Sequence, residues 1–214
     1  MAERINGRLA ASEKANGEQA GGGKLEFFLE FIRNPRQIGS VIPSSRFLER
    51  RVLDAAGLAS ARTVVELGPG TGGTTRSILA EMPDDSRLLS IEINPLLHAK
   101  VSEIEDPRLI PHLSSACDLS DVLAEHDLPA PDAVISGIPF STLDRGLGEA
   151  LVDAIPGVLA PGGCFVAYQA RDSVARLTDP VMRRTHTVTE FRNIPPMRVY
   201  RWTPASTPAS RRHE

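Results

Sequence analysis

From Val64 to Gly73 the chain reads Val-Val-Glu-Leu-Gly-Pro-Gly-Thr-Gly-Gly. Apolar β-branched residues lead straight into a glycine-rich loop, and a pattern typical of a helix follows it. Glycine adopts positive φ and lets the backbone approach a ligand closely, and the amides at a helix N-terminus favour a negative group. The stretch therefore predicts a strand, a loop for a nucleotide-type cofactor, and a helix.

Two classes of cofactor fit this loop. Gly68, Gly70 and Gly73 satisfy the dinucleotide fingerprint G-x-G-x-x-G, which has low specificity on its own. The loop also carries Glu66 before the first glycine and Gly72 at a third alternate position. This E-x-G-x-G-x-G form resembles motif I of the class I methyltransferases, which use S-adenosylmethionine.

Two later stretches bear on this choice. Glu92 ends the next apolar run, and its carboxylate fits the ribose of either cofactor because NAD enzymes place an acid similarly. The end of Asp132–Phe140 resembles the strand-4 motif (D/N/S)-x-x-P-(F/Y) of amino-group methyltransferases, although an ordinary strand ending in an X-Pro turn reads the same way. In those families a side-chain oxygen and a backbone carbonyl orient the amine beside an aromatic ring. The order of these signals favours a methyltransferase over a dehydrogenase.

Composition narrows the class of protein further. The 214 residues suffice for one α/β domain, and the net charge of −3 provides no basic field for stable nucleic-acid binding. Cys117 and Cys164 stand alone, without the spacing of metal ligands, so no metal is expected. Neither a membrane-spanning run nor a signal-peptide core is visible. We expect a soluble or peripheral protein in the cytoplasm.

The alternation of short apolar runs and helical patterns predicts an α/β fold. It is Rossmann-like, with a seven-stranded, mostly parallel sheet and helices on both faces. Predicted strands are Thr63–Leu67, Arg87–Ile91, Arg108–Pro111, Ala133–Ser136 and Cys164–Gln169, with an antiparallel pair near Val181–Phe191 and Met197–Trp202. Predicted helices are Arg46–Ala56, Gly72–Glu81, Pro95–Ile104, Leu119–His126, Leu143–Leu159 and Asp172–Leu177.

Four segments are expected along the chain. Residues 1–23 and 204–214 are polar and are predicted to be disordered. Residues 24–58 form a helical lid or membrane-contact segment, and residues 59–203 form the cofactor-binding domain. The segment begins with Lys24–Arg33, an N-terminal amphipathic helix that packs on the domain, lies in a membrane interface, or serves as a lid that does both.

Five sequence blocks together resemble bacterial phospholipid N-methyltransferases, over about residues 25–202. They are N-P-x-x-x-G-S-x-x-P-S-S at Asn34–Ser45, E-L-G-P-G-T-G at Glu66–Gly72, E-I-N at Glu92–Asn94, S-G-I-P-F at Ser136–Phe140 and R-N-I-P-P at Arg192–Pro196. The middle three blocks are shared with ribosomal RNA adenine dimethyltransferases. The resemblance implies an S-adenosylmethionine-dependent enzyme that methylates phosphatidylethanolamine toward phosphatidylcholine at the inner face of the cell membrane.

The resemblance also implies roles for particular residues. Cofactor-binding candidates are Glu66, Gly68, Gly70, Gly72, Glu92, Asn94, Ser115, Ala116 and Ser136. Catalytic candidates are Ser136, Ile138, Pro139 and Phe140, and substrate-binding candidates are Gln37, Ser40, Tyr168, Arg192 and Tyr200. For the phosphate of the lipid head group the cationic candidates are Arg33, Arg36, Arg192 and Arg198, and Arg192 is favoured because the resemblance places it in the last block.

The chain departs from the family pattern at two places. Where such families carry Gly-Asp-Ala, the chain reads Ser114-Ser115-Ala116, so adenine recognition is left to Ser115, to Asp118 or to backbone groups; Asp118 also suits a helix N-cap. Gln169-Ala170 replaces the usual Gln-Tyr, which removes an aromatic neighbour of the substrate. An RNA adenine N6-dimethyltransferase, a small-molecule amine N-methyltransferase and a non-catalytic cofactor-binding protein therefore remain alternatives.

Overall fold

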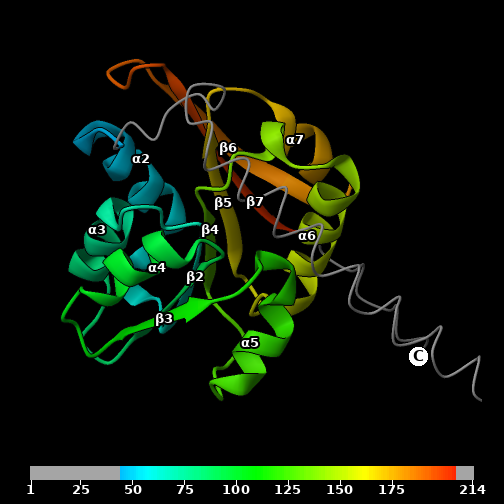
Figure 1. Ribbon diagram of the computed structural model, residues 1–214. Helices are drawn as coiled ribbons and strands as arrows, with labels where there is room; N and C mark the ends of the chain where they lie inside the picture. Colours follow the sequence, from blue (N-terminus) through cyan, green and yellow to red (C-terminus); the bar gives the residue numbers. More distant parts are fainter. Residues whose placement is uncertain (1–43, 206–214) are drawn as a thin grey trace, which may run out of the picture. The chain divides into compact units, whose positions relative to one another are not determined.

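The computed structural model describes residues 44–205, and their core is a seven-stranded sheet of order β3-β2-β1-β4-β5-β7-β6 (Figure 1). Strands β1 to β5 run parallel, and β7 is antiparallel to both of its neighbours. The strands are β1 (Thr63–Leu67), β2 (Arg87–Glu92), β3 (Leu109–Leu113), β4 (Ala133–Ser136), β5 (Cys164–Gln169), β6 (Met182–Glu190) and β7 (Met197–Pro204). This arrangement confirms the predicted Rossmann-like class.

Helices cover both faces of the sheet. The α-helices are α2 (Arg46–Ala56), α3 (Gly73–Glu81), α4 (Pro95–Ser102), α5 (Leu119–Glu125), α6 (Arg145–Val158) and α7 (Ser173–Thr178), and the 3₁₀ turns are η1 (Leu58–Ser60), η2 (Ala116–Asp118) and η3 (Phe140–Thr142). Alternate strand residues point to opposite faces, so Val64 packs with α2, α3 and α4 while Val65 packs with α5, α6 and α7. The strands are apolar on both faces because both faces are covered.

Helix α2 has the bounds that the sequence predicted, but it belongs to the core. Ser45 accepts a hydrogen bond from the Leu48 amide at 3.3 Å, which caps the helix, and Gly57 ends it with φ of 69°. Leu48 and Val52 are each 1% exposed in the cluster that covers one face of the sheet. We expected α2 to belong to a separate segment that ends at residue 58. Its packing against the sheet makes it part of the cofactor-binding domain instead.

The predicted C-terminal boundary also shifts. Pro204 was assigned to a disordered tail, but it is the last residue of β7 and lies opposite Met182. A proline is tolerated at a strand end, where its missing N–H costs no ladder bond. The lid or membrane helix predicted at Lys24–Arg33 lies outside the described residues, as do Gln37 and Ser40.

Candidate functional site

The site lies where the strand order reverses, between β1 and β4. Ligands of open α/β sheets bind at this point, beyond the carboxyl ends of the strands. The Gly137 amide donates to the Leu67 carbonyl at 2.9 Å, which joins the two loops. A Cβ on Gly68 would lie 2.9 Å from Cγ1 of Ile138, and one on Gly137 would lie 2.9 Å from the Gly68 carbonyl oxygen. Both positions therefore require glycine.

The glycine loop has the conformation that its sequence predicts. Gly70 and Gly72 have φ of 60° and 83°, and Gly72 is the N-cap of α3. A Cβ on Gly70 would meet no atom within 4 Å, so the backbone faces open space. The buried carboxylate of Glu92 borders this part of the loop, since its Oε2 accepts from the Gly70 amide at 3.2 Å. A cradle of this kind fits a cofactor whose polar groups contact backbone amides and carboxylates.

Glu66 supports the loop from beneath. Its side chain is 2% exposed, and Oε2 accepts hydrogen bonds from Thr75 Oγ1 at 2.6 Å and from Ser90 Oγ at 3.1 Å. Burial raises the pKa of Glu66 to about 7, although both hydroxyl donors act against the shift. The two hydroxyls fix the carboxylate at the carboxyl end of β1, below the loop.

Glu92 stands at the carboxyl end of β2 and is held by backbone groups. Its two oxygens accept from the amides of Asn94 at 2.9 Å and Gly70 at 3.2 Å. Burial raises the pKa of Glu92 and these amides lower it. Asn94 has a structural role in addition, because its Oδ1 caps α4 by accepting from the Leu96 amide at 2.8 Å. Glu92 can still accept ribose hydroxyls, since each carboxylate oxygen has two lone pairs.

The loop after β3 is closed by its own hydrogen bonds. Ser115 Oγ accepts from the Cys117 amide at 3.2 Å, and Asp118 accepts from Ser114 Oγ at 2.8 Å. Asp118 occupies the N-cap position of α5 but its side chain caps no amide there. The side chains that could replace the family's usual acid are thus already paired with the loop itself. Recognition of adenine by Ser115, Ala116 or Asp118 remains a prediction.

The strand-4 motif is fixed by hydrogen bonds that involve Ser136 and Ile138. Ser136 is fully buried, and its Oγ accepts from the Ile138 amide at 3.2 Å. Phe140 is 3% exposed and belongs to the core cluster shared with α6 and α7. The Ile138 carbonyl accepts a hydrogen bond from Gln169 Nε2 at 2.8 Å and retains a second lone pair. Ser136 thus holds the loop after β4, and a role for the Ile138 carbonyl as acceptor for a ligand stays a prediction.

Gln169 and Gly137 were not among the predicted site residues. Gln169 is a buried polar residue at the carboxyl end of β5, where apolar residues precede it, and that contrast was the available signal. Gly137 lies inside the strand-4 motif. It must lack a side chain because a Cβ at this position would lie 2.7 Å from the Tyr168 hydroxyl.

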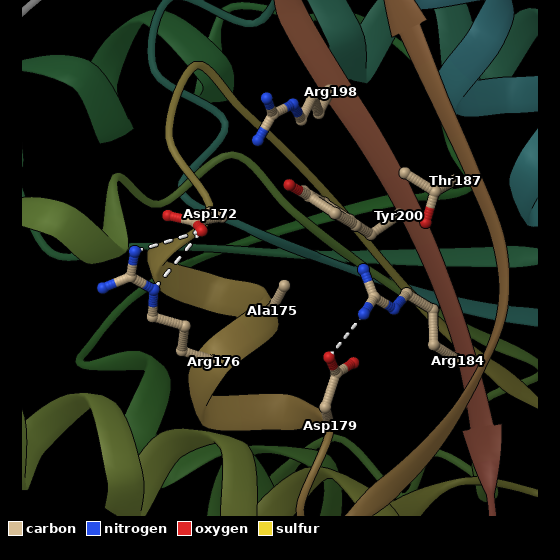
Figure 2. A pocket seen from close by; sticks show the side chains of 8 residues that line it. All are labelled: Asp172, Ala175, Arg176, Asp179, Arg184, Thr187, Arg198 and Tyr200. Atoms are coloured by element: carbon tan, nitrogen blue, oxygen red, sulfur yellow. Dashed lines mark hydrogen bonds and ion pairs between the residues drawn. The ribbon is translucent and has the colours of Figure 1, made fainter.

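The structure separates the two tyrosines expected at the substrate. Tyr168 lies on the sheet face covered by α2, with its hydroxyl 3.3 Å from Thr74 Oγ1. Burial raises the pKa of Tyr168 to about 12, so it remains a neutral hydroxyl. Tyr200 is 2% exposed on the opposite face, stacked on Trp202 and lining a pocket beside α7 (Figure 2).

Arg192 already has partners. Its guanidinium donates to Glu190 at 2.9 and 3.1 Å and lies 3.9 Å above the centre of the Phe47 ring. The Arg192 guanidinium lowers the pKa of Glu190 to about 2 and its own pKa is raised in turn. These contacts tie the β6–β7 turn to α2. A role for Arg192 at a lipid phosphate stays a prediction.

One group of potential metal ligands occurs within residues 44–205. His112 Nδ1 and His126 Nε2 lie 3.0 Å apart, and a carboxylate oxygen of Glu125 completes a set within 4.8 Å. The two rings are T-shaped and share a hydrogen bond. This group lies on β3 and at the end of α5, away from the β4 motif.

Comparisons with known proteins agree with this geometry. No family model matches the chain. The ornithine lipid N-methyltransferase of Singulisphaera acidiphila is 29% identical over 187 residues, covering 82% of this chain and 94% of that protein. Ribosomal RNA small subunit methyltransferase A of Kineococcus radiotolerans is 30% identical over 112 residues, covering 51% of this chain and 36% of that enzyme.

Solved structures share the fold. The fibrillarin of Aeropyrum pernix, determined with natively bound S-adenosylmethionine, has a TM-score of 0.52 and 16% identity over 69% of this chain and 68% of its own. Strand order, glycine loop and sequence similarity together define a class I methyltransferase. The chain is an S-adenosylmethionine-dependent methyltransferase of that class.

Proposed function

We propose that the chain transfers methyl groups from S-adenosylmethionine to the primary amine of a membrane lipid head group. The observation that carries the proposal is the similarity to an ornithine lipid N-methyltransferase along nearly the whole length of that protein. The ribosomal RNA relative, in contrast, matches only about half of this chain and about a third of its own length. Ornithine lipid therefore stands beside phosphatidylethanolamine as a candidate substrate.

The cofactor-side residues divide into a cradle and its supports. Bound S-adenosylmethionine supplies an electrophilic methyl group on a sulfonium. The amides of the loop around Gly70 and the carboxylate of Glu92 would hold its polar groups, while Glu66 fixes the loop through Thr75 and Ser90. These are fixed contacts, so their contribution is orientation.

On the amine side, residues 44–205 offer hydrogen-bond acceptors, and none of these residues is assigned as a general base. A primary ammonium must lose a proton before its lone pair can accept a methyl group. The Ile138 carbonyl can accept an N–H of the neutral amine and direct the lone pair, and Gln169 fixes that carbonyl. Tyr168, with a pKa of about 12, acts as a neutral hydroxyl beside Gly137. Proton release to solvent is then sufficient, and positioning accounts for the catalysis.

A membrane location has support at the β6–β7 turn. Phe191 and Ile194 are large apolar residues with 76% and 78% exposure, and Arg192 lies between them. Apolar side chains at such a tip can enter the interface of a bilayer, and the adjacent arginine can contact lipid phosphates. No helix within residues 44–205 is long and apolar enough to span a membrane. We infer peripheral binding at the inner face of the cell membrane.

The test is methylation of lipids by the purified protein. It is incubated with radiolabelled S-adenosylmethionine and liposomes that contain either phosphatidylethanolamine or ornithine lipid, and the extracted lipids are resolved. Label in one lipid supports the proposal and identifies the head group. Label in neither lipid, with cofactor binding confirmed by calorimetry, contradicts it and favours a different amine substrate.

A further inference from the structure

We infer that the pocket between α7 and the β6–β7 hairpin binds the anionic group of the substrate, so that the substrate is a zwitterion with an anion close to its amine. The inference rests on the proposed function and narrows the substrate class. The pocket has a volume of about 460 Å³, and Figure 2 shows charged side chains from α7, β6 and β7 around it. Phosphate and carboxylate are the two anions that a lipid head group of this kind carries.

The charges of the pocket leave one arginine available. Arg176 pairs with Asp172 at 3.2 Å, and Arg184 pairs with Asp179 at 2.7 Å. Arg198 forms no ion pair or side-chain hydrogen bond with any residue between 44 and 205, and Figure 2 draws no dashed line to it. The pocket therefore carries one net positive charge, located on Arg198.

Two other charged residues of the pocket, Asp179 and Arg184, are held in place by hydrogen bonds and ring contacts. Asp179 accepts from Trp202 Nε1 at 2.8 Å in addition to Arg184. The Arg184 guanidinium lies 5.8 Å from the centre of the Tyr200 ring. These contacts hold the Asp179 carboxylate on Arg184 and Trp202, so it is not free to neutralise Arg198. An incoming anion would meet a planar guanidinium donor, which suits phosphate and carboxylate.

The pocket adjoins the proposed amine site. Arg198 of β7 lies directly opposite Gln169 of β5, and Gln169 donates to the Ile138 carbonyl at 2.8 Å. Directly opposed residues share a sheet face with Cβ atoms about 5 Å apart. A head group whose amine is at the Ile138 carbonyl can therefore place an anion at Arg198 across a short linker. The ethanolamine phosphate and ornithine head groups both have such a linker.

Binding of soluble head groups tests this inference without depending on catalysis. The protein, saturated with S-adenosylhomocysteine, is titrated calorimetrically with O-phosphoethanolamine, Nα-acetylornithine and ethanolamine. At least one anionic amine should bind about tenfold or more tightly than ethanolamine, because a charge-assisted hydrogen bond is gained. Arg198→Ala should remove that preference. Arg183→Ala, on an exposed arginine of the same hairpin outside this pocket, should retain it.

The two anionic probes distinguish phosphate from carboxylate. An Arg198→Ala protein that keeps the wild-type preference, or a wild-type protein that prefers neither anionic amine, would overturn the inference. Melting temperatures of both variants verify that they are folded. If the protein binds an anionic amine through Arg198 but labels no lipid, the role of this pocket is supported and the proposed function is contradicted. Lipid methylation that is unaffected by Arg198→Ala would support the proposed function and contradict the role of this pocket.

Discussion

The backbone amide of Ser45 donates a hydrogen bond to Oδ1 of Asn193 at 2.9 Å, across 148 positions of the chain. Ser45 caps α2, and Asn193 is 6% exposed in the turn between β6 and β7. The side-chain Nδ2 of Asn193 also donates to the Pro195 carbonyl at 2.9 Å. The sequence blocks that end at Ser45 and begin at Arg192 thus meet in the folded chain, where Asn193 joins the start of α2 to the hairpin.

Asn193→Ala should destabilise the domain, because it leaves the Ser45 amide and the Pro195 carbonyl without their partner. The expected loss is about 1–3 kcal/mol in the free energy of unfolding, measured by urea denaturation. The neighbouring Ile194→Ala serves as the control, since Ile194 is 78% exposed and should change stability by less than about 0.5 kcal/mol. Equal effects of the two substitutions would contradict the role of Asn193.

Glu66 should make stability depend on pH. Its pKa is about 7 in the folded chain against an ordinary 4.5, so the folded state binds the proton more tightly. That stability is fully present below pH 4.5 and is lost as the pH rises through 7. Glu66→Gln should be more stable than wild type at pH 8 by about 3 kcal/mol and similar at pH 4. Parallel stability profiles of the two proteins would contradict this.

Gly137→Ala should impair methyl transfer. Its Cβ would lie 2.7 Å from the Tyr168 hydroxyl and 2.9 Å from the Gly68 carbonyl oxygen, so both loops must move. We expect at least a tenfold loss of kcat, since small displacements at a reacting centre are costly. Gly157→Ala in α6 is the matched control because its Cβ would meet nothing within 4 Å. That change should leave kcat unchanged and stabilise the helix by about 0.5–1 kcal/mol.

Gln169→Met tests the role of the Ile138 carbonyl. The substitution preserves the size of the side chain but removes the donor that fixes this carbonyl at 2.8 Å. We expect kcat to fall about tenfold while the Kd for S-adenosylmethionine is unchanged, because the hydrogen bond of Gln169 goes to the proposed acceptor of the amine. A parallel weakening of cofactor binding would show that Gln169 supports the whole crevice.

The exposed apolar tip is the simplest membrane test. Replacing Phe191 and Ile194 together with serine should reduce cosedimentation with liposomes several-fold and leave cofactor affinity unchanged. Leu96→Ser on α4 provides the comparison, because Leu96 is 73% exposed but lies on a helix remote from the hairpin in sequence. If both proteins bind liposomes as wild type does, membrane contact must come from elsewhere in the chain.

Much of the fold was predictable because local signals and burial agree. The apolar run at Thr63–Leu67 and the helical pattern at Arg46–Ala56 predicted their elements with the observed bounds. Boundaries moved where tertiary contacts decide them: β7 extends to Pro204 because Met182 lies opposite, and α6 begins at Arg145, where Asp144 caps its amides. The predicted glycine-loop geometry is confirmed by the positive φ of three of its glycines.

The amine side was less predictable, since it depends on register and burial. Tyr168 and Tyr200 are equivalent candidates in the sequence, but the pairing of Ala167 with Tyr200 places the two tyrosines on opposite faces. Ser136, a predicted catalytic and cofactor-binding residue, is fully buried and accepts a hydrogen bond from the Ile138 amide, which its local sequence does not show. Gln169 gains its role only because β5 lies beside β4. None of these relationships is encoded in local patterns.

The location of the transferred methyl group tests the central proposal most directly. The protein is incubated with S-adenosylmethionine that carries an isotopically heavy methyl group, in the presence of liposomes containing both candidate lipids and of ribosomal RNA. Gly70→Val, which fills the open side of the cofactor loop, is the inactive control. Mass spectrometry should place the heavy methyl on the amine nitrogen of a lipid head group. Heavy methyl on RNA adenine, or on neither lipid, would contradict the proposed function.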